Sequence, residues 1–416
     1  MSNVSLLYEK NIVGKYKKSL DYLHNHLPIF QKIGQLAYKA DLSSTRQLMN
    51  FHGNPELKFK SVLVAGTNGK GSVTTLLAEI FRKNNYKVGL YTSPHFKDFR
   101  ERIRINKKKI RKTYVVDFIE ENKHQWKSIS PSFFEITVAM AFSYFAENKV
   151  DIAIVEVGMG GRLDSTNVLV PELSIITRIG MDHQKYLGDS LEKIATEKAG
   201  IIKKGQSVII GQNQTVAREA IERIARGQNA QLFQAISFQG ELPEEVPIYQ
   251  RENIGTVLMA IKVLHSKGWE LQEKKVLKHC IRTLQKNILP GRWQTLSEQP
   301  KIVAEAAHNL DGMEVCLKQL QKESYEDLHI VFGTVNDKSY APILNMLPKS
   351  AHYYWCKAEI PRGENAAALR EAGIKIGLKG QAYDSVQEAF KEAKKQAEAN
   401  DFVLITGSIF VIAEIL

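Results

Sequence analysis

Cysteine is scarce in this sequence, with three residues among 416. Cys280, Cys316 and Cys356 lie far apart, and no two of them form a C-x-x-C pair. This spacing argues against a disulfide framework and a structural zinc site, and it is typical of a protein from a reducing compartment. We therefore expect three buried or neutral thiols.

Long apolar runs are also missing. No stretch approaches the ~20 consecutive apolar residues that span a bilayer, and residues 1–10 contain no basic segment that leads into an apolar core. We therefore expect a cytoplasmic protein without a membrane partner. The length and the 44% hydrophobic content suffice for two or three globular domains.

Acidic residues are outnumbered, since 57 Lys and Arg residues against 45 Asp and Glu residues give a formal net charge of +12. The densest basic cluster is Lys107–Lys112, beside Arg100, Arg102 and Arg104. A solvated turn between two elements explains this cluster, and a multiply anionic small substrate would also benefit from its field. Neither interpretation requires nucleic acid, and we expect no nucleic-acid partner.

The most informative stretch is Val62–Ser72, with the sequence VLVAGTNGKGS. Its apolar start predicts a buried strand, and residues 72–83 predict a helix with one apolar side. Gly66, Gly69 and Gly71 are expected to adopt backbone angles closed to other residues, so that N–H groups converge on a phosphate at a helix N-terminus. The strict G-x-x-x-x-G-K-[ST] pattern is absent, because Val64 replaces its first glycine and a glycine follows Lys70. A plain glycine-rich turn remains the alternative.

Strand and helix patterns alternate after this loop and again after residue 297. Such alternation predicts mostly parallel sheets covered by helices. We expect an α/β protein with an N-terminal P-loop-type, mostly parallel sheet domain with helices on both faces (residues 1–296). A smaller Rossmann-like α/β domain would follow (residues 297–416).

Polar side chains follow several predicted strands. Glu156 ends a buried strand, and carboxyl ends of parallel strands are where open α/β sheets bind ligands. A carboxylate there is suited to hold Mg²⁺ on a nucleotide, although it could also cap a turn. His183 follows the next strand and is either a site residue or a core histidine, and the hydroxyl of Thr92 either binds metal or caps a turn.

The segment Ser132–Glu135 begins a predicted helix with the S-x-x-E pattern of a capping box. Capping alone accounts for Ser132 and Glu135. A flat aromatic substrate that stacks on Phe133 or Phe134 is the alternative.

These motifs, taken in order along nearly the whole chain, resemble the folylpolyglutamate synthase/dihydrofolate synthase family of the Mur ligase superfamily. The segments that carry the resemblance are Gly66–Ser72, Tyr91–His95, Ser132–Glu135, Glu156–Asn167, Asp182–His183, Glu197–Ile201, Asn253, Leu289–Arg292, Ala307–Asn309, Gly333–Lys338 and Thr406–Ser408. The resemblance implies an ATP-dependent ligase that activates a carboxylate as an acyl phosphate, which the amino group of L-glutamate then attacks.

The resemblance also implies roles for individual residues. The catalytic residues would be Lys70, Lys198 and His308. Contacts to ATP would come from Asn68, Gly69, Lys70, Gly71, Ser72, Asn253, Arg292 and Glu305. The pterin-bearing substrate would lie against Ser132, Phe133, Phe134, Glu135, Leu163, Asp164 and Ser165. Mg²⁺, in two sites, would be held by Thr92, Glu156, His183 and Lys198, the last as a carbamate formed with CO₂.

The sequence departs from the family pattern at Glu305–Leu310, where the usual D-G-A-H-N-P reads EAAHNL. The acid is one methylene longer and the proline is missing, which puts the ATP contact of this segment in question. Thr92 replaces the usual serine, a conservative change.

We expect a monomer that adds L-glutamate to dihydropteroate, to reduced folates, or to both. Two alternatives remain. One is a Mur-type cell-wall ligase that acts on a UDP-sugar peptide, and the other is a non-catalytic, nucleotide-dependent RNA-binding protein. The K-G-S form of the loop and the Ser132–Glu135 segment favour the folate branch, and no aromatic RNA-reading motif is present.

Overall fold

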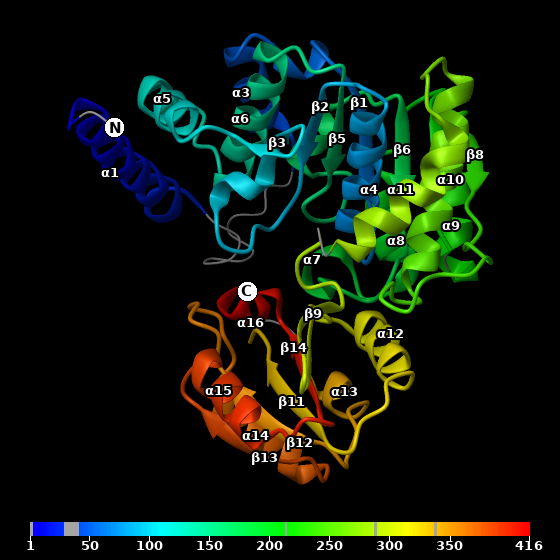
Figure 1. The fold of residues 1–416 in the computed structure, drawn as a ribbon. Coiled ribbons are helices and arrows are strands. Elements are labelled where there is room, and N and C mark those ends of the chain that lie inside the picture. The colour runs from blue at the N-terminus through cyan, green and yellow to red at the C-terminus, as the bar shows by residue number, and fades with distance from the viewer. Residues whose placement is uncertain (1–2, 29–40, 213, 287–288, 337–338) are drawn as a thin grey trace. The chain divides into compact units, whose positions relative to one another are not determined.

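Parallel strands dominate a sheet of eight strands in this computed structural model, which describes residues 3–28, 41–212, 214–286, 289–336 and 339–416 (Figure 1). The strands are β1 (Lys60–Ala65), β2 (Val88–Tyr91), β3 (Ile103–Ile105), β4 (Lys108–Lys109), β5 (Ile152–Glu156), β6 (Leu173–Ile176), β7 (Ser207–Ile210) and β8 (Gln231–Gln234). Their order is β4-β3-β2-β5-β1-β6-β7-β8. All pairs from β2 to β8 are parallel, whereas β3 and β4 add an antiparallel hairpin at one edge.

Helices cover this sheet, which explains why its central strands are continuously apolar. Apart from α7, which is described below, the helices and short 3₁₀ turns between residues 3 and 285 are α1 (Asn3–Asn25), α3 (Ser43–Phe51), η2 (Pro55–Leu57), α4 (Lys70–Lys83), η3 (Phe99–Arg102), α5 (Lys112–Asn122), η4 (Gln125–Ser128), α6 (Phe133–Glu147), η5 (Ser165–Val168), α8 (Leu191–Ala199), α9 (Thr215–Gly227), α10 (Gln250–Ser266) and α11 (Glu273–Gln285). Helix α4 packs against β1, β2 and β5. Helix α6 approaches β2 so closely that a Cβ at Gly89 would lie 2.9 Å from the ring of Phe145.

A second sheet of six strands has the order β13-β12-β11-β14-β10-β9. Its elements are β9 (Gln294–Glu298), β10 (Lys301–Glu305), α12 (Leu310–Leu320), β11 (Leu328–Gly333), α13 (Ala341–Leu344), β12 (His352–Cys356), α14 (Ala366–Lys375), β13 (Lys379–Tyr383), α15 (Val386–Gln396), β14 (Phe402–Gly407) and α16 (Ile409–Ile415). Only β9 runs antiparallel to its neighbour. Its core includes the buried rings of Phe332, Trp355 and Phe402. The predicted α/β class with two sheets is confirmed.

The chain divides into two compact units that do not follow the sequence order. The first contains residues 1–179, 192–236 and 255–276, and the second contains residues 180–191, 237–254 and 277–416. The short helix α7 (Gln184–Leu187) belongs to the second unit. The expected domain boundary after residue 296 falls inside β9. A division of the chain into two functional domains near this residue remains a prediction.

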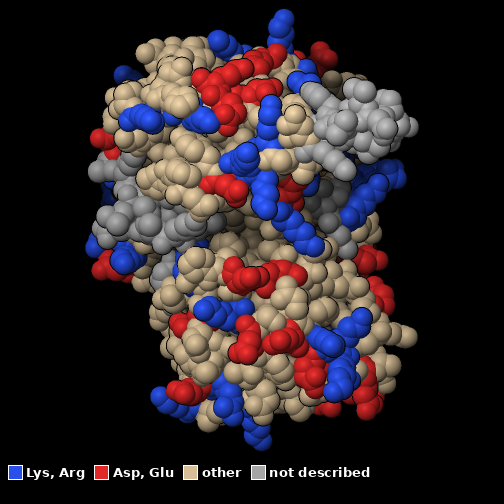
Figure 2. Space-filling model, turned by 90° about the vertical axis from the view of Figure 1, so that its left-hand side faces the viewer, with Lys and Arg blue, Asp and Glu red and all other residues tan. Residues whose placement is uncertain are grey.

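The basic cluster forms the solvated turn that the sequence suggested. Asn106 and Lys107 connect β3 to β4 with φ angles of 46° and 71°, the left-handed conformation that tight hairpin turns require. Lys107, Lys108 and Lys109 are exposed. On the face shown in Figure 2, Lys and Arg side chains are interspersed with Asp and Glu side chains.

The three cysteines are free and buried, as expected. Burial raises the pKa of the Cys280 thiol to about 12. None of the described helices is long and apolar enough to cross a bilayer.

Candidate active site

The carboxyl ends of four strands lie in register at one edge of the first sheet. Val64 of β1 pairs with Glu156 of β5, Ala65 pairs with Ile176 of β6, and Tyr91 of β2 pairs with Val155. Side chains that follow these strands are therefore brought together, because parallel strands end at a common edge. The structure therefore brings these strand ends together, whereas a ligand site at this edge remains a prediction.

The phosphate loop connects β1 to α4 at this edge. Gly66 and Gly69 have φ angles of 144° and 92°, which residues with a Cβ rarely adopt. A Cβ at Gly66 would lie 1.8 Å from Oγ1 of Thr177, which itself donates a hydrogen bond to the carbonyl of Asn68 over 2.7 Å. The first N–H groups of a 14-residue helix have no carbonyl within the helix to bind. The loop therefore presents backbone donors to an anion.

The prediction for Gly71 is wrong. This residue lies inside the first turn of α4, which begins at Lys70, and it does not have a positive φ angle. The helix starts two residues earlier than the sequence pattern suggested, so Gly71 needs no special backbone conformation. A Cβ there would meet Glu156 Oε2 at 3.7 Å, which is ordinary contact.

Lys70 folds back over the loop. Its Nζ donates hydrogen bonds to the carbonyls of Gly66 over 3.0 Å and Thr67 over 3.1 Å. The ammonium group is therefore held beside the loop by backbone acceptors, and its contact to the outer phosphates of ATP remains a prediction.

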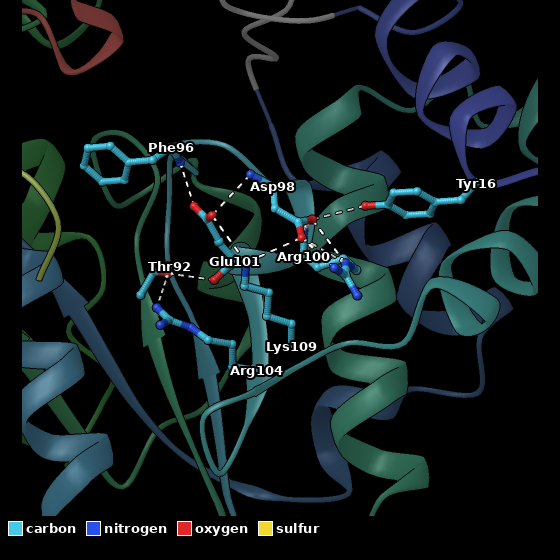
Figure 3. Close-up of polar contacts among 8 residues, drawn as sticks. All are labelled: Tyr16, Thr92, Phe96, Asp98, Arg100, Glu101, Arg104 and Lys109. Atoms are coloured by element: carbon cyan, nitrogen blue, oxygen red, sulfur yellow. Dashed lines mark hydrogen bonds and ion pairs between the residues drawn. The ribbon is translucent and has the colours of Figure 1, made fainter. Parts of the chain in front are cut away.

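Glu156 lies beside the loop that begins at Thr92. Oε2 of Glu156 accepts a hydrogen bond from the backbone N–H of Ser93 over 3.1 Å, and the side chain of Glu156 is buried. Oγ1 of Thr92 donates to the carbonyl of Glu101 over 3.4 Å and accepts from Nη2 of Arg104 over 3.3 Å. Figure 3 shows this contact between Thr92 and Arg104.

These oxygen ligands fit a hard divalent cation. Carboxylate and hydroxyl oxygens suit Mg²⁺, which usually keeps several waters and shares its ligands with substrate phosphates. The carboxylate of Glu156 lies beside Gly71 in the first turn of α4, where its two oxygens would be 3.7 and 3.8 Å from an added Cβ. Within the described part of the chain, no three His, Cys, Asp or Glu side chains cluster as a self-sufficient metal site. The residues present therefore fit an ion that a nucleotide would help to hold.

Lys198 reaches the same loop from the last turn of α8. Its side chain is only 4% exposed, and its Nζ donates a hydrogen bond to the carbonyl of Gly66 over 3.0 Å. Helical periodicity alone would not distinguish this lysine from the exposed Lys193 of the same helix. The structure thus places it beside the phosphate loop, whereas its carbamylation remains a prediction.

Ser132 and Glu135 form the predicted capping box of α6. The backbone N–H of Glu135 donates to Oγ of Ser132 over 3.3 Å, and the N–H of Ser132 donates to Oε2 of Glu135 over 2.7 Å. Oε1 of Glu135 also accepts hydrogen bonds from the hydroxyls of Ser44 and Thr45. Both residues therefore have a structural role, and their contact to substrate remains a prediction.

The two aromatic residues of this segment differ in exposure. Phe133 is buried and packs against Phe99 and His24. Phe134 is half-buried and lies over Gly158, where an added Cβ would come within 2.4 Å of its ring. Of the two, Phe134 is the better placed to touch a substrate.

The segment Leu163–Ser165 is anchored by Asp164. Its Oδ2 accepts from the N–H of Met159 over 2.9 Å, and its Oδ1 accepts from the N–H of Thr166 over 3.0 Å. Burial raises the pKa of the Asp164 carboxyl, while these hydrogen bonds act in the opposite direction. Asp164 and Ser165 are buried and Leu163 is half-buried, so their predicted contact to the pterin remains untested.

In the second unit, Asp182 joins two histidines that the sequence singled out. Its Oδ2 lies 3.2 Å from Nε2 of His308, and its Oδ1 accepts from the backbone N–H of His183 over 2.8 Å. Nδ2 of Asn309 also donates to Oδ2 over 3.3 Å. His183 has a φ angle of 51°, so this contact accompanies an uncommon backbone conformation. The metal role of His183 and the catalytic role of His308 remain predictions.

Glu305, the departure from the family pattern, has partners in the same unit. Its Oε2 accepts hydrogen bonds from the hydroxyl of Tyr249 and from the N–H of Trp293, both over 2.7 Å. Burial raises the pKa of the Glu305 carboxyl, against the opposing charge of Arg292 at 3.8 Å. The longer side chain is thus buried and engaged, so its contact to ATP remains a prediction.

Asn253 is also buried, and its Nδ2 donates to Oε1 of Gln250 over 2.8 Å. The sequence interpretation assigned no role to Tyr249 or Trp293, and it noted Arg104 only as a neighbour of the basic cluster. No local pattern marks Tyr249 or Trp293, because both contact Glu305, a residue distant in sequence. Part of the Gly333–Lys338 segment, residues 337–338, lies outside the described residues.

Family models match most of the chain. The Mur ligase middle domain matches residues 64–263, and the Mur ligase glutamate ligase domain matches residues 291–409. Among curated proteins, the dihydrofolate synthase/folylpolyglutamate synthase of Bacillus subtilis is 31% identical, and the alignment covers 96% of this chain and 98% of that protein. A probable bifunctional folylpolyglutamate synthase/dihydropteroate synthase of Haloferax volcanii is 30% identical over 90% of this chain, which spans only 48% of that longer protein.

Solved structures agree with these matches. Escherichia coli FolC in complex with DHPP and ADP superimposes with a TM-score of 0.85 at 29% identity, and the alignment covers 96% of both chains. The bifunctional enzyme of Yersinia pestis complexed with AMPPNP and Mn ion has a TM-score of 0.82 at 26% identity, with coverage of 96% of this chain and 97% of that one. The chain therefore belongs to the folylpolyglutamate synthase/dihydrofolate synthase family of Mur ligases and is an ATP-dependent ligase.

Proposed function

We propose that this enzyme adds L-glutamate both to dihydropteroate and to reduced folates. The observation that carries the proposal is the convergence of the phosphate loop, Glu156 and Lys198 at one edge of the first sheet. The relatives support the same acceptors, since the B. subtilis protein is named for both synthase activities. The E. coli structure holds DHPP, and another similar structure holds L-glutamate.

The reaction has two balanced steps. A carboxylate oxygen of the acceptor attacks the γ-phosphorus of ATP, and ADP leaves. The amino group of glutamate then attacks the acyl carbon, phosphate leaves with the C–O bonding pair, and the new amide nitrogen loses a proton. In this proposal Lys70 and the N–H groups of residues 69–72 stabilise the phosphoryl oxygens, where charge rearranges in the transition state. The N–H of Asn68 donates to the carbonyl of Arg178 over 3.3 Å, so Asn68 would contact ATP through its side chain.

The same proposal assigns the metal ligands. Glu156, the hydroxyl of Thr92, His183 and carbamylated Lys198 would hold Mg²⁺, which would offset charge on the phosphoryl oxygens. Carbamylation joins the neutral amine of Lys198 to CO₂ with release of a proton, and it requires that this amine first lose its charge.

Residues of the second unit complete the assignment. Asn253, Arg292 and Glu305 would contact ATP, and His308 would act at the reacting groups. Asp182 would orient His308 through the 3.2 Å contact to its Nε2. On the acceptor side, Phe134 and Leu163 would line the pterin site, with Ser132, Phe133, Glu135, Asp164 and Ser165 behind them. We also infer a monomer whose functional domains divide near residue 296.

The test is ADP release by the purified protein with Mg²⁺-ATP and L-glutamate, with dihydropteroate, tetrahydrofolate or no acceptor. We expect turnover with each acceptor and a background rate without one. Turnover with a single acceptor would overturn the bifunctional assignment, and no turnover with either would overturn the folate assignment.

A further inference from the structure

Two arginines in and just before β3, the strand beside β2, carry charges that the proposed mechanism does not use. Arg102 ends η3 and Arg104 lies in β3, where it pairs with Leu90 of β2. Both reach the loop that follows β2, since Arg102 contacts His95 and Arg104 contacts Thr92. They therefore flank the strand-end edge that holds Glu156.

Arg102 is buried against neutral groups. Its side chain is 3% exposed, its Nε donates to Nδ1 of His95 over 2.8 Å, and its guanidinium lies 5.3 Å from the centre of the Phe133 ring. Burial, followed by the charge of Arg102, lowers the pKa of His95 to about 3. The imidazole is therefore neutral near pH 7 and accepts the hydrogen bond without compensating the charge.

The guanidinium of Arg104 uses only part of its hydrogen-bonding capacity. Nη2 donates to the hydroxyl of Thr92 over 3.3 Å, and the buried Nε has no hydrogen-bond partner among the described residues. Within that part of the chain, neither Arg102 nor Arg104 lies within ion-pair distance of a carboxylate. Burial lowers the pKa of both guanidinium groups, although the more distant charges of Glu101 and Glu156 act in the opposite direction. The net lowering reflects the cost of removing a charge from water without a directly paired carboxylate.

Arg100 provides the contrast within the same segment. Its Nη2 and Nε donate to the carboxylate of Asp98 over 2.7 Å and 3.1 Å. Figure 3 shows Arg100 turned toward Asp98 and Tyr16, and Arg104 turned toward Thr92, on opposite sides of Glu101. The carboxylate of Glu101 instead accepts from the N–H groups of Phe96 and Asp98 over 2.8 Å and 3.2 Å. The carboxylates of Asp98 and Glu101 are thus bound by other donors.

We propose that Arg102 and Arg104 form the site that receives the carboxylate of the acceptor substrate. Arg104 contacts this carboxylate directly, and Arg102 is a positioning residue that acts through His95 and Phe133. The inference rests on the proposed function, since it names the group of the acceptor that this edge of the sheet holds.

A carboxylate fits this site better than a nucleotide phosphate does. The planar guanidinium matches the two oxygens of a carboxylate, and the phosphate loop already supplies Lys70 and helix N–H groups for phosphates. The half-buried ring of Phe134 lies 6.1 Å, centre to centre, from the ring of Tyr91, which directly precedes the Thr92 contacted by Arg104. An acceptor that places its carboxylate at Arg104 would therefore have an aromatic surface close by.

The experiment compares equilibrium binding of dihydropteroate and of its carboxamide to the full-length protein with ADP and Mg²⁺, by calorimetry. The wild type should prefer the carboxylate by about 10- to 100-fold, the usual range for hydrogen bonds to a charged group. Arg104→Gln should lose this preference and keep its affinity for the carboxamide. The matched control Arg100→Gln should keep both affinities, because Arg100 is engaged with Asp98.

Arg104→Lys retains the positive charge but lacks the planar guanidinium, so it should show an intermediate preference for the carboxylate. This variant serves as the test if Arg104→Gln does not fold. A wild-type preference in both Arg104 variants would overturn the carboxylate site. Weaker ADP binding with an unchanged preference would also overturn it, since the arginines would then serve the nucleotide. ADP release by the wild type tests the proposed function separately from the arginine site. If the wild type turns over the acceptors and the Arg104 variants still prefer the carboxylate over the carboxamide, only the arginine site is refuted. No turnover and no acceptor binding by the wild type refute both.

Discussion

The Nζ atom of Lys198 donates a hydrogen bond to the carbonyl oxygen of Gly66 over 3.0 Å. A buried lysine from α8 is thereby fixed on the residue that opens the phosphate loop. This geometry places Lys198 where a charge on its side chain would act on the phosphates of a nucleotide.

Replacing Lys198 by alanine should abolish most turnover while the fold is retained. If the active form is a carbamate, bicarbonate cannot restore activity to Lys198→Ala, whereas a short carboxylic acid such as acetate should restore part of it. The exposed Lys193 of the same helix is the control, and Lys193→Ala should keep wild-type turnover. A native mass spectrum that retains CO₂ and shows unmodified Lys198 in fully active enzyme would refute the carbamate.

Glu156→Ala should reduce turnover by at least ~10², because its carboxylate lies beside the first turn of α4, where phosphoryl charge must be stabilised. Lys70→Ala should have a similar effect. Glu192→Gln, at an exposed carboxylate paired with Arg223, is the control for loss of a single charge. Steady-state ADP release measures all three variants, and near-wild-type rates for Glu156→Ala or Lys70→Ala would contradict their assignment.

The hydrogen bond between Tyr249 and Glu305 should stabilise the second unit. Tyr249→Phe removes a donor from a buried carboxylate and should lower the free energy of unfolding by about 1–3 kcal/mol. A double-mutant cycle with Glu305→Gln, followed by urea denaturation, isolates the coupling between the two side chains. Strictly additive effects of the two substitutions would show that the contact contributes nothing.

Asp98 should make stability depend on pH in the acid range. Burial acts to raise the pKa of Asp98, but hydrogen bonds and charge from Arg100 outweigh it and lower the pKa to about 2 from an ordinary value of 3.8. The unfolded state therefore binds a proton at higher pH than the folded state does, so the stabilisation is complete above pH 4 and is lost as the pH falls toward 2. The stability advantage of the wild type over Asp98→Asn should shrink across this window. An advantage that does not change between pH 5 and pH 2 would rule out this contribution.

The sequence predicted the elements whose identity is local. Buried strands such as β1 and β5 contain short apolar runs, and the α6 capping box is complete within Ser132–Glu135. Strands β9 and β13 were missed because their residues are mixed in polarity and become strands only by pairing with β10 and β12. The β3–β4 hairpin was missed for a similar reason, since only two exposed lysines form β4.

The candidate site likewise combines features that local sequence patterns predict and contacts that form only on folding. The loop, Glu156 and Thr92 could be placed from the sequence because each follows a strand that ends at a common edge. The contacts of Glu305 with Tyr249 and of Asp182 with His308 join residues 56 and 126 positions apart. No periodicity encodes such pairs, because they arise only when the elements pack.

The hairpin at the end of the first sheet has a consequence for behaviour at high protein concentration. Its outermost strand, β4, consists of Lys108 and Lys109, and both side chains are exposed. A second molecule that tried to add its own β4 alongside would oppose lysine to lysine, and a strand of two residues offers few backbone groups for pairing. This border of the sheet therefore resists edge-to-edge aggregation.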